Sequence, residues 1–391
     1  MTTTTSTTTT ATTSRHASVR TAPAVAPGTG PTSPSTTTPG PEQLAAVVAA
    51  VRRGRTTGRA RAVVVGLLLL LGCVVTFAAS LVVGEFALPL REVALALVGR
   101  GGDDAAFVVG TLRLPRAVTA VLVGAAFGLG GIVFQSLARN PLASPDVIGV
   151  SAGSTVAAVG VLVAGTAFGV QVDQALLTPA AFVGGLLATT AIYLLAWRRG
   201  LSAYRLVLVG IAVAAMLNAV TSYLLTRAEI TDAQRAFVWL TGSVNGRGWD
   251  DVRVMALALV VLVPLLLVLA SPLRTLQLGD DTARGVGVRV EPSRAALVVV
   301  ALGCVSVATA VAGPVAFVAF VAGPVARRLV GTPLTVVPAA LTGALLVLLS
   351  DLVARTALAP TELPVGIVTG LVGAPYLLWL LTRANRLGRT G

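Results

Sequence analysis

Lysine is missing from this sequence of 391 residues, which also has one histidine, two cysteines and only 12% charged residues. Soluble chains carry about 25% charged residues. Without lysine the chain has no Walker A loop, Schiff base or lysine general base. His16 lies near the N-terminus, so no histidine within an apolar run can hold zinc or haem. We expect no catalytic site, resident metal or cofactor.

The two cysteines, Cys73 and Cys304, both lie inside apolar runs. A thiol in that setting usually behaves as a small hydrophobic side chain. The sequence therefore predicts neither a disulfide nor a redox function.

Hydrophobic residues make up 55% of the chain, and the mean hydropathy is +0.87. This composition predicts an all-α polytopic membrane protein with about ten transmembrane helices. A span needs about 20 apolar residues to cross about 30 Å of hydrocarbon. The stretch 295–330 is either one long helix or two short ones broken at Gly313-Pro314. The ten-span prediction takes it as two, with spans near 62–83, 115–138, 147–168, 176–197, 206–226, 252–270, 295–313, 314–330, 333–354 and 363–382.

Charge distribution gives the predicted topology. The arginines punctuate apolar runs instead of clustering on a soluble face, which argues against a nucleic-acid partner despite a net charge of +13. With ten spans, 20 of the 29 arginines but only 5 of the 16 acidic residues lie on the side of the termini. The positive-inside rule then places both termini in the cytoplasm of a multi-pass plasma membrane protein.

Three regions follow from this pattern. Residues 1–60 are rich in Thr, Pro and Ser and predict a disordered cytoplasmic tail of unknown role. Residues 61–385 form the transmembrane domain, and 386–391 a short cytoplasmic tail.

Two local patterns stand out near the second span. Gly124, Gly128 and Gly131 recur on nearly one helical face, which predicts a close helix-packing seam. The following residues, RNPLASPDVIG at 139–149, predict a tight non-helical connection. Irregular backbone at membrane depth persists where protein or a water cavity covers it, which indicates a transport pathway.

Seven motifs follow one another along the apolar part of the chain: RLPR, Gln135, RNPLASPDVIGVSAG, LVGIAVAAMLN, LGDDTARGVGV, AVAGPVAFVAF and ELPVGIVTGLVGAPYLLWLL. With these motifs the sequence resembles the FecCD-type permease subunits of iron–siderophore and vitamin B12 ABC importers, most of all the ferric-enterobactin type. The resemblance covers about residues 62–385, and the motifs occur in the family's order. It implies a fold like that of type II ABC importer permeases.

The loop at about 271–294 is the richest in charge on the predicted inner side. Its composition alone fits a solvated loop or a short helix equally well, with Asp280 or Asp281 as a cap. The resemblance implies that it holds a coupling helix that docks into a separate ATPase subunit. The residues expected there are Gly279, Asp280, Asp281, Ala283, Arg284 and Gly287.

The resemblance also assigns residues at the two ends of the pathway. Arg113, Arg116 and Arg355 match positions that receive acidic residues of an extracytoplasmic binding protein. A plainer alternative is that they anchor helix ends, with Arg355 paired to Asp351 four residues before it. The family pattern places Leu142, Ser202 and Ala203 at an inner gate.

These observations predict a permease subunit that imports a ferric siderophore by alternating access, together with a second permease, either a paralogue or itself. A cobalamin or haem importer of the same family is the first alternative. An ion-coupled secondary transporter would need acidic residues at mid-membrane, and the spans lack them apart from Asp351 near one end. An intramembrane enzyme is disfavoured by the missing lysine, histidine and paired carboxylates.

Overall fold

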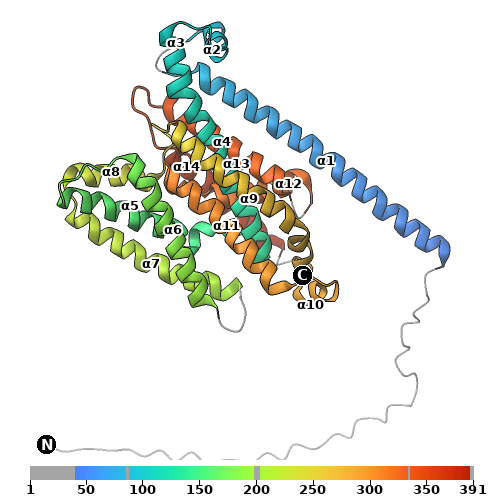
Figure 1. The fold of residues 1–391 in the computed structure, drawn as a ribbon. Coiled ribbons are helices and arrows are strands. Elements are labelled where there is room, and N and C mark those ends of the chain that lie inside the picture. Colours follow the sequence, from blue (N-terminus) through green and yellow to red (C-terminus); the bar gives the residue numbers. More distant parts are fainter. Residues whose placement is uncertain (1–39, 85–87, 198–202, 333–334, 388–391) are drawn as a thin grey trace, which may run out of the picture. The chain divides into compact units, whose positions relative to one another are not determined.

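The computed structural model describes residues 40–84, 88–197, 203–332 and 335–387. It divides the chain into two units, Met1–Arg53 and Gly54–Gly391, and the features below belong to the second. All regular elements in the described ranges are helical (Figure 1). They are α1 (Pro41–Val82), α2 (Leu90–Leu97), α3 (Asp103–Phe107), the π-helical turn η1 (Val108–Arg113), α4 (Leu114–Ala138), the 3₁₀ turn η2 (Pro145–Ile148), α5 (Val150–Ala167), α6 (Gln174–Ala196), α7 (Ala203–Arg227), α8 (Ile230–Thr241), α9 (Trp249–Leu276), α10 (Asp280–Gly285), α11 (Val290–Ala312), α12 (Val318–Val330), α13 (Val336–Thr356) and α14 (Val365–Leu387).

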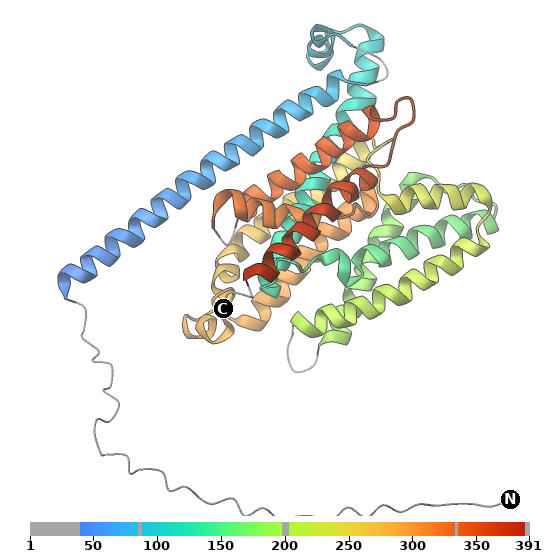
Figure 2. The same cartoon turned by 180° about the vertical axis from the view of Figure 1, so that it is seen from behind.

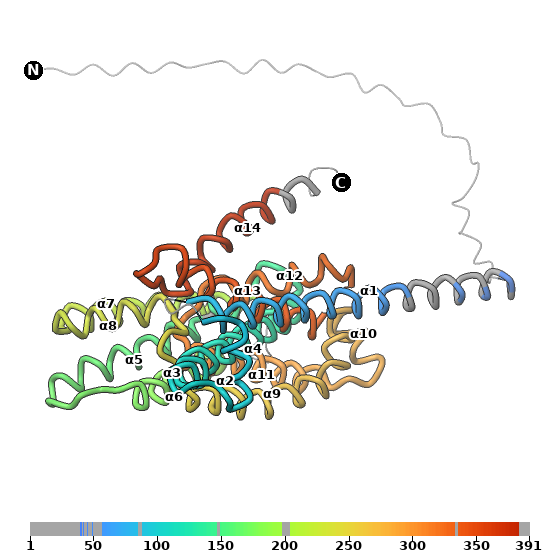
Figure 3. Tube along the Cα trace, turned by 90° about the horizontal axis from the view of Figure 1, so that it is seen from above, coloured from blue at the N-terminus to red at the C-terminus, as the bar shows by residue number. Residues whose placement is uncertain are grey.

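Helix α4 is the central element of the second unit. It packs against α9, α11, α12 and α13, and most of its side chains are buried. Helices α5 to α8 form a neighbouring group, which α11 joins to α4 through contacts with α5 and α6 (Figures 1 and 3). Figure 2, the view from behind, shows α13 and α14, in red, on the face of the unit that Figure 1 turns away from the reader.

The predicted glycine seam on α4 is confirmed. A side chain at Gly124 would collide with the backbone of Gly343, and one at Gly128 with the backbone of Ala339, both on α13. At Gly131 the obstacle is the carbonyl oxygen of Ala319 on α12. At Gly124 and Gly128 the backbones of α4 and α13 run antiparallel in direct contact, and only glycine permits such a contact because it has no side chain.

Nine described helices are long and apolar enough to cross a membrane. The stretch 295–330 divides at residues 313–317 into α11 and the 13-residue α12, so the two-helix alternative is correct. A 13-residue helix rises about 20 Å, and five non-helical residues can add up to about 16 Å. Only if these five residues were fully extended would the two parts cover about 30 Å of hydrocarbon, so the tenth crossing stays a prediction for this segment.

Contacts at the C-terminal end of α12 show that α1 and α14 reach the same end of the unit. The Arg61 side chain on α1 donates from Nε to the Leu329 carbonyl oxygen at 2.8 Å. The Arg328 guanidinium lies 4.4 Å from the centre of the Trp379 ring on α14. This arrangement agrees with an even number of crossings. We refer to this end, which also carries α10, as the inner end, and to the end at the start of α4 as the outer end.

Helix α1 begins earlier than the predicted transmembrane domain. It starts at Pro41, so residues 41–60 of the predicted disordered tail are helical. Proline suits the first turn of a helix, and the Ala-rich segment that follows has high helix propensity. Residues 1–39 lie outside the described ranges.

Candidate functional site

The outer end is organised by Arg116, near the start of α4. Its Nε and Nη2 donate to Asp351 Oδ1 on α13 at 3.0 and 2.8 Å. Its Nη1 donates to Glu362 Oε2 at 2.9 Å and to Asn245 Oδ1 at 3.1 Å. One guanidinium thus joins α4, α13, the loop before α14 and the loop after α8. The planar fork of arginine suits such multiple carboxylate contacts.

The other two predicted docking arginines contact the end of α1. Arg113 Nη1 donates to the carbonyl oxygens of Leu81 and Val82 at 2.8 and 3.0 Å. Arg355 Nη2 donates to Ser80 O at 2.7 Å and to Ser80 Oγ at 2.9 Å. These carbonyls belong to the last turn of α1, where helices leave acceptors unsatisfied and cations are favoured.

The structure brings Arg113, Arg116 and Arg355 together around a cavity of about 300 Å³. Each is only 7–8% exposed. Asp351 Oδ1 accepts from Arg116, whereas Arg355 Nε lies 4.0 Å from Asp351 Oδ2. Asp351 therefore forms a hydrogen-bonded ion pair with Arg116 and a longer ion pair with Arg355, so the predicted pairing of Arg355 with Asp351 is present but is the weaker of the two.

Sequence reasoning missed two members of this cluster, Glu362 and Arg247. Glu362 opens the ELPVG motif that carries part of the family resemblance, so a signal was present. Arg247 lies in the loop after α8, whose path depends on how α8 packs against α5 and α14, so the sequence alone gives it no partner.

The predicted short helix at the inner end is confirmed as α10. Gly279 precedes it with a φ of 119°, a conformation that favours glycine, and Gly287 follows it with a φ of 85°. Neither Asp280 nor Asp281 caps the helix, because both lie within its first turn, where acidic side chains favour the helix dipole. Ala283 is fully buried against the unit.

The two aspartates of α10 have different environments. Asp280 is half-buried and accepts from Arg294 Nη2 at 2.8 Å and from Arg139 Nη2 at 2.9 Å. Its hydrogen bonds to Arg294, together with the charges of Arg294 and Arg139, lower the pKa of Asp280. Asp281 is fully exposed and pairs only with Arg284, one turn along. Asp280 therefore ties α10 to α4 and α11, while Asp281 faces outward.

Two of the three predicted gate residues, Leu142 and Ala203, lie in the described ranges. Leu142 is half-buried in the turn after α4, and its backbone N–H donates to Asn140 Oδ1 at 2.9 Å. Ala203 begins α7, and Ser202 lies outside the described residues. The turn η2 packs against α7, and Leu206 lines a cavity of about 690 Å³ that reaches α10.

The described part of the chain is thus a bundle of long apolar helices with the short helix α10 at one end, an architecture that fits a polytopic membrane protein. The chain belongs to the FecCD transport family, whose model matches residues 70–383. It is therefore a permease of an ABC importer of the siderophore and vitamin B12 family, and lies in the bacterial plasma membrane.

Several relatives cover almost the same region. The ferric enterobactin transport system permease protein of Escherichia coli (strain K12) is 42% identical over 327 residues, covering 83% of this chain and 98% of the relative. The achromobactin transport system permease protein of Dickeya dadantii (strain 3937) is 40% identical over 339 residues, covering 85% and 95%. The cobalamin import system permease protein of Halobacterium salinarum (strain ATCC 700922 / JCM 11081 / NRC-1) is 35% identical over 311 residues, covering 78% and 82%.

A solved structure shares the fold. It shows an inward-facing conformation of a metal-chelate type ABC transporter, with a TM-score of 0.71 and 27% identity over 81% of this chain and 98% of the other. The predicted all-α permease architecture is therefore confirmed.

Proposed function

We propose that this chain imports a ferric siderophore by alternating access and is powered by a separate ATPase subunit. The observation that carries the proposal is α10, a short exposed helix held against the inner end of a FecCD permease. Since the chain has no lysine, it cannot form the phosphate-binding loop of a Walker A ATPase. It acts as a transport subunit and not as an enzyme, and both termini lie in the cytoplasm.

The proposed ATPase-docking surface consists of α10 and its flanking residues. Leu278 and Val286 are 72% and 67% exposed on either side of the helix, together with the charges of Asp281 and Arg284. At a water-facing end, neighbouring exposed apolar side chains are typical of a protein interface. Gly279 and Gly287 shape the loop, and buried Ala283 fixes the face that α10 turns toward the ATPase.

We assign the outer arginine cluster to docking of an extracytoplasmic siderophore-binding protein. Arg116 already holds a carboxylate, Glu362, whose side chain is 29% exposed. An acidic residue of a binding protein would replace Glu362 on the same guanidinium face. Arg113 and Arg355 would support the exchange by holding the end of α1 in place.

The inner gate is proposed at Leu142, in the turn after α4, and at Ser202 and Ala203, where the sequence enters α7. Helices α7 and α14 expose many apolar side chains, for example Met216 and Leu371. We assign these faces to the second permease subunit and to lipid.

Growth and uptake assays test the substrate. A deletion strain should lose uptake of radioiron supplied as one class of siderophore, and the intact gene should restore it. Retained iron uptake combined with loss of labelled cobalamin uptake would instead identify the cobalamin alternative. Parallel uptake with labelled haem covers the haem alternative.

A further inference from the structure

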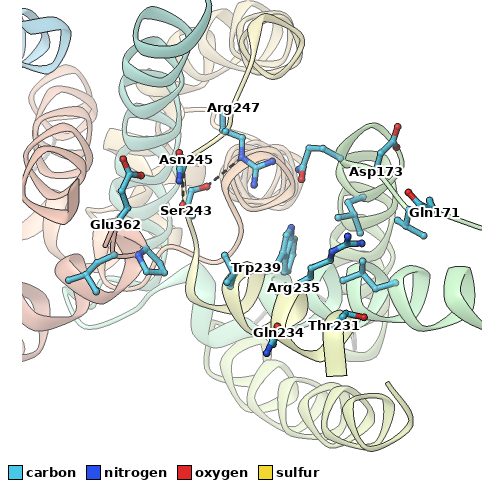
Figure 4. Close-up of a pocket in the computed structure, with 18 residues that line it drawn as sticks. Gln171, Asp173, Thr231, Gln234, Arg235, Trp239, Ser243, Asn245, Arg247 and Glu362 are labelled. Atoms are coloured by element: carbon cyan, nitrogen blue, oxygen red, sulfur yellow. Dashed lines mark hydrogen bonds between the residues drawn. The ribbon is translucent and has the colours of Figure 1, made fainter. Parts of the chain in front are cut away.

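A second and larger cavity opens at the outer end beside the arginine cluster. Its volume is about 920 Å³, within the range of about 300–1,000 Å³ typical of small-molecule sites. The walls are the loop between α5 and α6, one face of α8, the loop after α8 and the residues before α14 (Figure 4). Among the polar residues that line it are Gln171, Asp173, Gln234, Arg235, Arg247 and Glu362.

Arg247 is the dominant charge of this cavity. It is only 8% exposed, and its Nε lies 3.5 Å from the Ser243 carbonyl oxygen, at the limit of a hydrogen bond. Within the described ranges its other guanidinium N–H groups have no hydrogen-bond acceptor. Burial lowers the pKa of Arg247, and the charge of Asp251 only partly opposes this effect. A buried cation without a hydrogen-bonded anion is energetically costly.

Trp239 forms part of the cavity wall. It lies on α8, lines the same cavity and is 6% exposed. Its indole nitrogen is fully buried and has no hydrogen-bond partner in the described part of the chain, so it offers no donor that a ligand in the cavity can reach.

The acidic side chains of the cavity are already engaged. The two carboxylate oxygens of Glu362 accept from Arg116. Asp173 Oδ1 accepts from the Leu176 N–H at the start of α6. Arg247 and the exposed Arg235, by contrast, form no salt bridge with a carboxylate in the described part of the chain.

We propose that this cavity binds the anionic, oxygen-rich face of the imported ferric chelate, an inference that rests on the proposed import function. Arg247 forms paired hydrogen bonds with catecholate or carboxylate oxygens. A single carboxylate side chain of a docked protein would fill only a small part of 920 Å³, so the volume favours a whole small molecule.

The test uses the full permease complex in lipid nanodiscs without binding protein. The probes are a radioiron-labelled ferric tris-catecholate, which is anionic, and a ferric tris-hydroxamate, which is neutral. Arg247→Gln should weaken binding of the anionic probe about tenfold, the effect of losing a charge-assisted hydrogen bond. Arg247→Lys should recover part of that loss, and the neutral probe should change less than twofold.

Asp173→Asn is the matched variant, which removes a negative charge from the cavity instead of a positive one. Asparagine caps a helix as well as aspartate, so α6 should be preserved while one negative charge leaves the cavity. Binding of the anionic probe should tighten about twofold, since the removed charge is exposed and screened. Because this variant is on the surface, it keeps the test valid if Arg247→Gln fails to fold.

Unchanged affinity in both charge variants, or equal losses for both probes, would overturn the proposal. So would an Arg247→Gln complex that loses only its affinity for the binding protein, because the cavity would then be a protein-docking site. Arg247-dependent probe binding in a complex that imports no ferric chelate would leave this site standing and overturn the proposed transport function.

Discussion

Replacing Asp280 with asparagine tests whether α10 is held by its internal ion pairs. The change keeps the size of the side chain but removes the charge that Arg294 and Arg139 share. Hydrogen bonds to charged groups contribute about 1.5–3 kcal/mol when buried, and exposed pairs about 0–1 kcal/mol. Arg294 is 16% exposed, but Arg139 is 47% and Asp280 35% exposed. Solvent screening therefore reduces the combined contribution of the two ion pairs to about 2 kcal/mol.

A loss of about 2 kcal/mol shifts the equilibrium between seated and released α10 about 30-fold. Hydrogen exchange of residues 279–287 in the purified complex should therefore accelerate. Chelate import per ATP hydrolysed should fall in reconstituted vesicles, because a loosely held helix transmits less of the ATPase motion.

Asp281→Asn is the matched control. Asp281 is fully exposed and pairs only with Arg284, so hydrogen exchange of α10 should stay within twofold of wild type. Equal exchange rates in the two variants, with equal coupling ratios, would refute the argument that Asp280 holds the helix.

Three further predictions concern other parts of the unit. Gly131→Ala should destabilise the protein by about 1–3 kcal/mol and lower its thermal midpoint in detergent, because the new methyl group meets the Ala319 backbone. Gly370→Ala is the control: the position has open space around it, so the thermal midpoint should stay unchanged or rise. Glu362→Gln should tighten association with the binding protein in a pull-down titration by freeing Arg116, and equal or weaker association would count against carboxylate exchange. Burial raises the pKa of Asp146, in the turn between α4 and α5, from 3.8 to about 6. The folded state therefore binds this proton more tightly than the unfolded state, and the stability of the protein should fall as pH rises from about 4 to 6. Asp146→Asn should flatten this part of the plot of stability against pH, and an unchanged plot would contradict the assignment.

The architecture follows from the sequence because span length, hydropathy and glycine spacing are local signals. The seam at Gly124 and Gly128 was predictable for the same reason, since close helix packing in lipid requires small residues at fixed intervals. The segment at residues 313–330 was harder to predict. Its 13-residue helix is too short for a standard span, and its position depends on packing against α4 and α13.

The candidate site was predictable in its residue types but not in its partners. The family resemblance identified Arg116 and Arg355, and spacing predicted the ion pair of Arg355 with Asp351, but only the fold brings Asp351 to Arg116, 235 positions away. The environment of Arg247 was not predictable either, because it exists only once α8 packs beside the loop between α5 and α6. Such long-range pairings depend on tertiary structure and carry no local pattern.

The energy source of transport tests the central claim most directly. The permease, its ATPase and its binding protein would be reconstituted in vesicles, and accumulation of a radioiron-labelled ferric chelate measured with ATP on the ATPase side. Replacing the phosphate-binding lysine of the ATPase with alanine should abolish accumulation, while ionophores that collapse ion gradients should leave the wild-type complex active. Accumulation that survives the lysine replacement but stops with ionophore would contradict the account and identify an ion-coupled transporter.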